Sequence, residues 1–134
     1  MKIVICGAGL VGSAIAGHLA EEQNDVTVVD ASAENIQRIT DQHDVTGVIG
    51  VASHPDRLNE AGMRDAELLI AVTESDEVNM VACQVAHTIF DTPVKIARIR
   101  GSSYLDENYA DLYSPAHLPI DYIISPEAEV SASV

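Results

Sequence analysis

The stretch that decides the fold is Lys2-Ile-Val-Ile-Cys-Gly-Ala-Gly-Leu-Val-Gly12. After Lys2, residues 3–6 are apolar and mostly β-branched, which is typical of a strand buried on both faces of a parallel sheet. From Leu10 to Leu19 the apolar residues recur at helical spacing. The motif Gly7-x-Gly9-x-x-Gly12 therefore falls where a buried strand turns into a helix.

Each glycine of this turn has its own task in a dinucleotide-binding loop. Gly7 allows the tight turn, Gly9 lets the backbone approach a pyrophosphate, and Gly12 lets the helix pack closely on the strand. The phosphates would meet free N–H groups at the positive end of the helix. Residues 25–29 form a second predicted strand that ends at Asp30, whose carboxylate can accept both hydroxyls of an adenosine ribose and repel a 2′-phosphate. The alternative is an ordinary strand-to-helix turn, with Asp30 capping the next helix.

Length and charge limit the class of protein. With 134 residues the chain is about one domain, too short for a nucleotide domain plus a substrate domain. The net charge of −14 argues against general binding to nucleic acid or anionic lipid. One explanation of the negative charge is solubility and a long-range electrostatic field. The alternatives are adaptation to a salty cytoplasm and binding to a basic partner, and composition does not distinguish among them. No signal peptide or membrane-spanning apolar run is seen, and the two cysteines form no C-x-x-C motif, so we expect a cytoplasmic protein without direct membrane insertion.

Strands and helices alternate along the rest of the chain. Further strands are predicted at 45–49, 66–72, 93–100 and 121–124, and further helices at 32–39, 56–61 and 78–90. A polar connector with a short helix near 106–111 spans 101–119. This order predicts an α/β fold, a Rossmann-like doubly wound parallel six-stranded sheet with strand order 3-2-1-4-5-6. We expect a nucleotide-binding domain over 1–125 and the opening of a further helix over 126–134.

No catalytic or metal-binding pattern is legible in the sequence. Dehydrogenases commonly use a Tyr-x-x-x-Lys or His–Asp pair, and neither is found; the histidines are scattered and the phosphate-loop motif of nucleotide hydrolases is missing. Arg98 and Arg100 lie on one face of a predicted strand, at the carboxyl end where a cofactor crevice is expected. They would contact the cofactor phosphates or, alternatively, form surface ion pairs.

Several segments beyond the glycine motif carry a more specific signal. They are Thr73-Glu-Ser-Asp-Glu-Val-Asn79, Ile96-Ala-Arg-Ile-Arg100 and Ile120-Asp-Tyr-Ile-Ile-Ser-Pro126. Together with the glycine loop and Asp30, they resemble the nucleotide-binding domain of the RCK (KTN) family, which gates potassium channels and transporters. The resemblance covers essentially the whole chain. Its Thr-x-x-Asp-Glu-x-Asn element is more specific than the glycine motif, because other dinucleotide-binding domains lack it.

The resemblance implies a function as well as a fold. It implies a regulatory domain that binds NAD(H), or ATP and ADP, and controls potassium uptake through a Trk-type membrane subunit. It also implies dimers, with higher rings in the full-length protein, at the inner face of the membrane. The implied cofactor residues are Gly7, Ala8, Gly9, Leu10, Val11, Asp30, Thr73, Glu74 and Arg98. Many members have Gly-Asp-Ala-Thr where this chain has 50–53 as Gly-Val-Ala-Ser, so any role of that aspartate near the adenine is missing here. The alternative function is a fragment of an NAD-dependent dehydrogenase that lacks its substrate domain.

Overall fold

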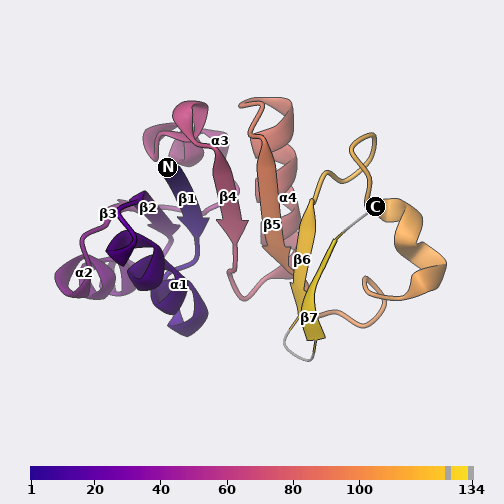
Figure 1. Ribbon diagram of the computed structural model, residues 1–134, viewed down its shortest axis with the longest axis horizontal. Coiled ribbons are helices and arrows are strands. Elements are labelled where there is room, and N and C mark those ends of the chain that lie inside the picture. Colours follow the sequence, from indigo (N-terminus) through magenta and orange to yellow (C-terminus); the bar gives the residue numbers. More distant parts are fainter. Residues whose placement is uncertain (126–127, 133–134) are drawn as a thin grey trace.

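The computed structural model describes residues 1–125 and 128–132 and shows one twisted sheet between two layers of helices (Figure 1). Strands β1 to β6 are parallel and follow the predicted order 3-2-1-4-5-6, and β7 is added antiparallel to β6. The strands are β1 (Lys2–Cys6), β2 (Asp25–Asp30), β3 (Thr46–Ile49), β4 (Leu68–Ala71), β5 (Val94–Arg98), β6 (Tyr122–Ser125) and β7 (Ala128–Ala132). The predicted doubly wound topology is therefore confirmed.

The helices begin close to their predicted positions. They are α1 (Leu10–Glu21), α2 (Ala33–Gln42), α3 (Pro55–Glu60) and α4 (Asp76–Thr88), with 3-10 turns η1 (Met63–Asp65) and η2 (Glu107–Leu112). Ser32 caps α2 by accepting a hydrogen bond from the Asn35 N–H at 3.1 Å. Ser75 caps α4 in the same way, accepting from the Val78 N–H at 3.2 Å. This second cap explains why α4 begins two residues earlier than its apolar periodicity predicts. Among the helices of residues 1–125, none is long and apolar enough to cross a lipid bilayer.

Strand β1 shows why its sequence is a continuous apolar run. Ile3 and Ile5 pack in the cluster that α1 and α2 cover, whereas Val4 and Cys6 pack in the cluster beneath α3 and α4. All four side chains are at most 1% exposed. A strand buried on both faces needs apolar residues at every position, since neither face meets water. The glycine loop therefore follows directly from a strand that is packed on both faces.

The end of the described chain differs from the prediction. The sequence predicts a helix opening within 126–134, but the structure has strand β7 at Ala128–Ala132, paired with β6 through Tyr122–Ala132 and Ser125–Ala128. The parallel sheet leaves one edge of β6 without a neighbour, and the returning chain satisfies those free N–H and C=O groups. Residues 126, 127, 133 and 134 of the predicted helix lie outside the described residues. The division of the chain at residue 125 stays a prediction.

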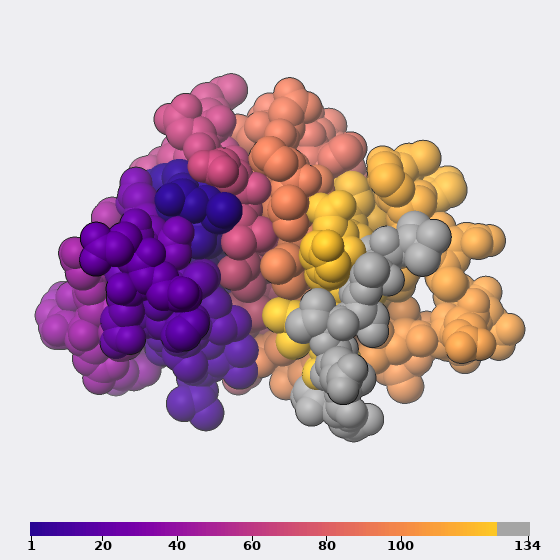
Figure 2. Space-filling model, in the orientation of Figure 1, coloured from indigo at the N-terminus to yellow at the C-terminus, as the bar shows by residue number. Residues whose placement is uncertain are grey.

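The connector between β5 and β6 forms a lobe at the edge of the molecule (Figure 2). Its predicted short helix is the 3-10 turn η2, which the Asp106 side chain caps by accepting a hydrogen bond from the Asn108 N–H at 2.8 Å. Two tyrosines tie the connector to the body and to itself. The Tyr104 hydroxyl donates to Glu77 Oε2 at 2.8 Å, and the Tyr113 hydroxyl donates to the Tyr104 carbonyl at 2.9 Å. The connector is thereby attached to the first turn of α4.

Candidate nucleotide-binding crevice

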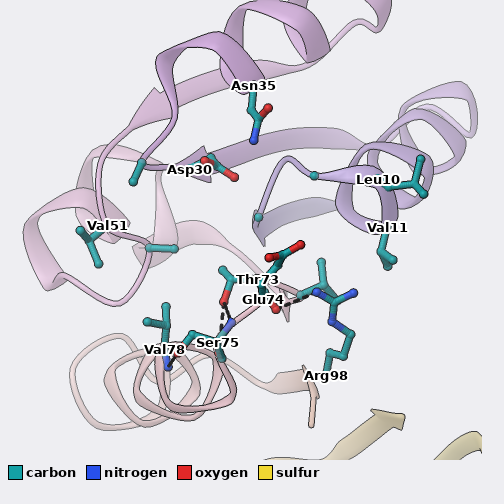
Figure 3. Close-up of a pocket in the computed structure, with 15 residues that line it drawn as sticks. Leu10, Val11, Asp30, Asn35, Val51, Thr73, Glu74, Ser75, Val78 and Arg98 are labelled. Carbon is teal, nitrogen blue, oxygen red and sulfur yellow. Dashed lines mark hydrogen bonds between the residues drawn. The ribbon is translucent and has the colours of Figure 1, made fainter. Parts of the chain in front are cut away.

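The carboxyl ends of the central strands surround one crevice of about 590 Å³ (Figure 3). It lies where β1 and β4 are neighbours and the chain reverses its direction across the sheet, the position at which open α/β sheets bind ligands. All the predicted cofactor residues except Ala8 line it, namely Gly7, Gly9, Leu10, Val11, Asp30, Thr73, Glu74 and Arg98. The topology therefore brings residues from both halves of the chain to one cavity.

The glycine loop has the geometry that its spacing predicts. Gly7 has a φ of 110°, in the region that favours glycine, and its N–H donates to the Val29 carbonyl at 2.8 Å. A Cβ at Gly12 would collide with the Gly7 carbonyl, so glycine is needed there for the close packing of α1. A Cβ at Gly9 would meet no protein atom within 4 Å. The space that Gly9 leaves open therefore serves the crevice and not the packing of the chain.

Asp30 braces the glycine loop as well as lining the crevice. One carboxylate oxygen accepts the Ala8 N–H at 2.7 Å, and the other accepts the Ser32 N–H at 2.7 Å. Ala8 is fully buried and does not line the crevice, so its N–H positions Asp30. Each carboxylate oxygen has a second lone pair and can accept a further hydrogen bond. The half-buried Asp30 can thus hold the loop and accept hydroxyl groups at the same time.

Arg98 supplies positive charge at the end of the crevice opposite Asp30, next to Thr73 and Glu74 (Figure 3). This end is called the far end below. Its Nη2 donates to the Thr73 carbonyl at 2.9 Å, which joins the end of β5 to the loop after β4 (Figure 3). Its Nε is buried and has no hydrogen-bond partner within the described part of the chain. Burial, followed by the neighbouring Arg100 charge, lowers the pKa of the Arg98 guanidinium, which is still protonated at neutral pH. An anion at this position would meet a charge that is partly desolvated.

Arg100 has a different environment from Arg98. It does not line the crevice, and it lies two residues beyond the end of β5 at Arg98, whereas the sequence predicts one strand over 93–100 that carries both arginines on one face. Its guanidinium donates to the Glu74 carbonyl at 2.6 Å, and its N–H donates to Asp76 Oδ1 at 3.0 Å. Neither arginine forms an ion pair within residues 1–125, so the alternative of a surface ion pair is not found. Arg100 instead holds the β4–α4 loop from outside.

Several lining residues were not predicted from the sequence. Asn35 fits an imperfect capping box, but its side chain points into the crevice beside Asp30 (Figure 3). Val51, in the loop after β3, and Val78, in α4, add apolar surface to the lining (Figure 3). Val51 lies two residues after the end of β3, in the stretch 50–55 that the sequence places at the ligand-binding edge of the sheet, although no role in the site is predicted for it. Across residues 1–125 and 128–132, no group of three or more His, Cys, Asp or Glu side chains is arranged to hold a metal ion.

A sequence model of the TrkA-N domain matches residues 3–126, nearly the whole chain. The chain belongs to the TrkA-N domain family. Among its curated relatives is the Trk system potassium uptake protein TrkA of Azorhizobium caulinodans, 58% identical over 134 residues. That alignment covers 100% of this chain and 29% of the relative, so the chain spans less than a third of the relative's length. The predicted membership of this domain type is therefore confirmed.

Solved structures support the same fold for this TrkA-N domain. The TrkA-N domain of the Escherichia coli inner membrane protein ybaL superposes with a TM-score of 0.79 at 17% identity, covering 94% of this chain and 87% of that one. A GsuK channel bound to NAD superposes with a TM-score of 0.67 at 20% identity, covering 77% of this chain and 18% of that one. At these identities the likeness establishes the fold alone.

Proposed function

We propose that this TrkA-N domain binds NAD(H) in the crevice without consuming it, and that occupancy of the crevice regulates potassium uptake through a Trk-type membrane subunit. The observation that carries the proposal is the meeting of the glycine loop, Asp30 and Arg98 at one cavity. A volume of about 590 Å³ also lies within the usual range of about 300–1,000 Å³ for ligand pockets.

Each part of a dinucleotide has a matching group in the crevice. Asp30 would accept the hydroxyls of the adenosine ribose, and the free N–H groups of residues 9–11 would bind the pyrophosphate. Val51 and Val78 offer apolar contact to the adenine. Thr73 and Glu74 would border the far end of the cofactor, and Arg98 would contact the cofactor from β5 and offset the charge of its phosphates. ATP and ADP share the adenine, ribose and phosphates, so they would compete for the same crevice.

The position of the crevice suggests how binding would become regulation. Its walls come from β1 and β2 on one side and from β4 and β5 on the other, so a ligand that bridges them favours one arrangement of the two halves. The A. caulinodans relative is a potassium uptake protein, and the NAD-bound neighbour is a channel. We therefore propose a Trk-type potassium-translocating partner, association of copies as dimers and rings, and a location at the inner face of the membrane.

Calorimetric titration of the purified chain with NADH, NAD⁺, ADP and ATP tests ligand binding. The proposal expects at least one dinucleotide to bind, and failure of all four to bind would overturn it. Incubating the full-length protein with NADH and a panel of carbonyl acceptors tests whether the protein oxidises NADH. Turnover of about 1 s⁻¹ or more, as is typical of enzymes, would favour a dehydrogenase instead.

A further inference from the structure

Asn79 belongs to the most specific motif of the sequence, and none of the roles described above uses it. It lies in α4, is 0% exposed and does not line the crevice. Its Oδ1 accepts the Thr73 N–H at 2.9 Å and the Thr73 hydroxyl at 2.7 Å. Its Nδ2 donates to the Thr73 carbonyl at 3.1 Å and to the Arg98 carbonyl at 2.8 Å. The amide thus uses all of its donors and acceptors on two residues.

These contacts close a ring at the far end of the crevice. The Thr73 carbonyl that accepts from Asn79 also accepts from Arg98 Nη2 at 2.9 Å. The Arg98 backbone and the Arg98 side chain are therefore both fixed relative to Thr73, one through Asn79 and the other directly. No hydrogen bond in the described chain joins Asn79 to Asp30 or to the glycine loop. The ring holds one end of the crevice independently of the other.

We infer that Asn79 is a positioning residue, which sets the preference of the crevice for dinucleotides over AMP by holding Thr73 and Arg98 in their binding geometry. The inference rests on the proposed function. AMP needs only the adenosine end and one phosphate, both served by Asp30 and the glycine loop. A dinucleotide also needs the far end, and a far end that is already ordered spares the cost of ordering on binding.

The chemistry of the ring requires asparagine. An aspartate would have no N–H to donate and would direct a buried negative charge at two carbonyl oxygens. An alanine would remove all four hydrogen bonds and leave the Thr73 N–H without its partner. Asn79→Ala is therefore the variant that tests the inference, because alanine removes the hydrogen bonds without introducing a charge.

The experiment titrates NADH and AMP into wild type, Asn79→Ala and the matched control Met80→Ala. Met80 is the next residue of α4, is buried in the core and does not line the crevice, so it controls for lost stability. Asn79→Ala should weaken NADH binding by at least about tenfold and AMP binding by no more than about twofold. Met80→Ala should change the ratio of the two affinities by less than about twofold. An equal loss for both ligands in Asn79→Ala, or the same ratio in both variants, would overturn the inference.

A second measurement needs no variant and decides the matter if Asn79→Ala does not fold. In wild type, the side-chain NH₂ resonances of Asn79 should shift when NADH saturates the protein and stay unchanged with AMP. Resonances unmoved by saturating NADH would overturn the inference. A wild-type chain that binds neither ligand would instead remove the proposed function, so the two failures are distinguishable.

Discussion

Replacing Asp30 with alanine removes a carboxylate that has two roles, one in the fold and one in the proposed binding of NADH. Its oxygens accept the N–H groups of Ala8 and Ser32, each at 2.7 Å, and in the proposed complex they also accept the ribose hydroxyls. Asp30→Ala should therefore lower the free energy of unfolding as well as the affinity for NADH. The sequence motif alone predicts only the second effect.

The expected size of each effect follows from these contacts. A hydrogen bond to a charged group contributes about 1.5–3 kcal/mol when it is shielded from water. Asp30 is only half-buried and water replaces part of each bond, so we expect a combined loss of stability of about 2 kcal/mol. Loss of the ribose contacts should weaken NADH binding by about 1–3 kcal/mol, or about 5–150-fold. NADPH should lose less, because the repulsion of its 2′-phosphate by Asp30 is removed too.

Titrations with NADH and NADPH, together with thermal unfolding, measure both effects. Asp41→Ala is the matched control, since it removes an equal charge from an exposed side chain that contacts only Gln37 among the hydrogen bonds of the structure. Wild-type affinity for both dinucleotides in Asp30→Ala would show that the carboxylate only braces the loop. Unchanged unfolding would show that the Ala8 and Ser32 bonds contribute nothing.

Two further predictions concern the far end of the crevice and the core. Arg98→Ala should weaken NADH and ADP by about 2 kcal/mol, or roughly 30-fold, and spare adenosine, which has no phosphate; equal loss for adenosine would indicate damaged folding instead. Burial raises the pKa of the Cys6 thiol from 9.0 to about 12. Below pH 9 both states keep the proton, and between 9 and 12 only the unfolded state loses it, so stability should fall as pH rises through this window, by up to about 1.4 kcal/mol per pH unit. Urea unfolding across alkaline pH measures the slope, which Cys6→Ala should reduce; an unchanged slope would refute this origin.

The sheet and the place of the crevice could be predicted because they depend on local patterns. The run Ile3–Cys6 and the glycines after it identify the central strand and its ligand-binding end. The hydrogen bonds that shape the crevice join residues that are distant in sequence, such as Ala8 with Asp30 and Asn79 with Arg98, 22 and 19 positions apart. No periodicity reports such pairs, since they depend on side-chain rotamers and on how strands are placed beside each other. Strand β7 was missed for a related reason, because its pairing depends on the open edge of β6 and not on its own residues.

In the proposed complex the two ends of the crevice would recognise different parts of the ligand. In the proposed complex the glycine loop would bind through backbone N–H groups, so it would recognise a pyrophosphate whatever is attached to it. In that complex the choice among NADH, ADP and ATP would fall to the far end, where Arg98 is the positive side chain of the lining and Glu74 is the exposed acid beside it. A third phosphate would bring its charge toward the Glu74 carboxylate and the acidic first turn of α4 at Asp76 and Glu77. A nicotinamide ribose brings no such charge, so in the proposed complex we expect the electrostatics of the far end to favour the dinucleotide over ATP.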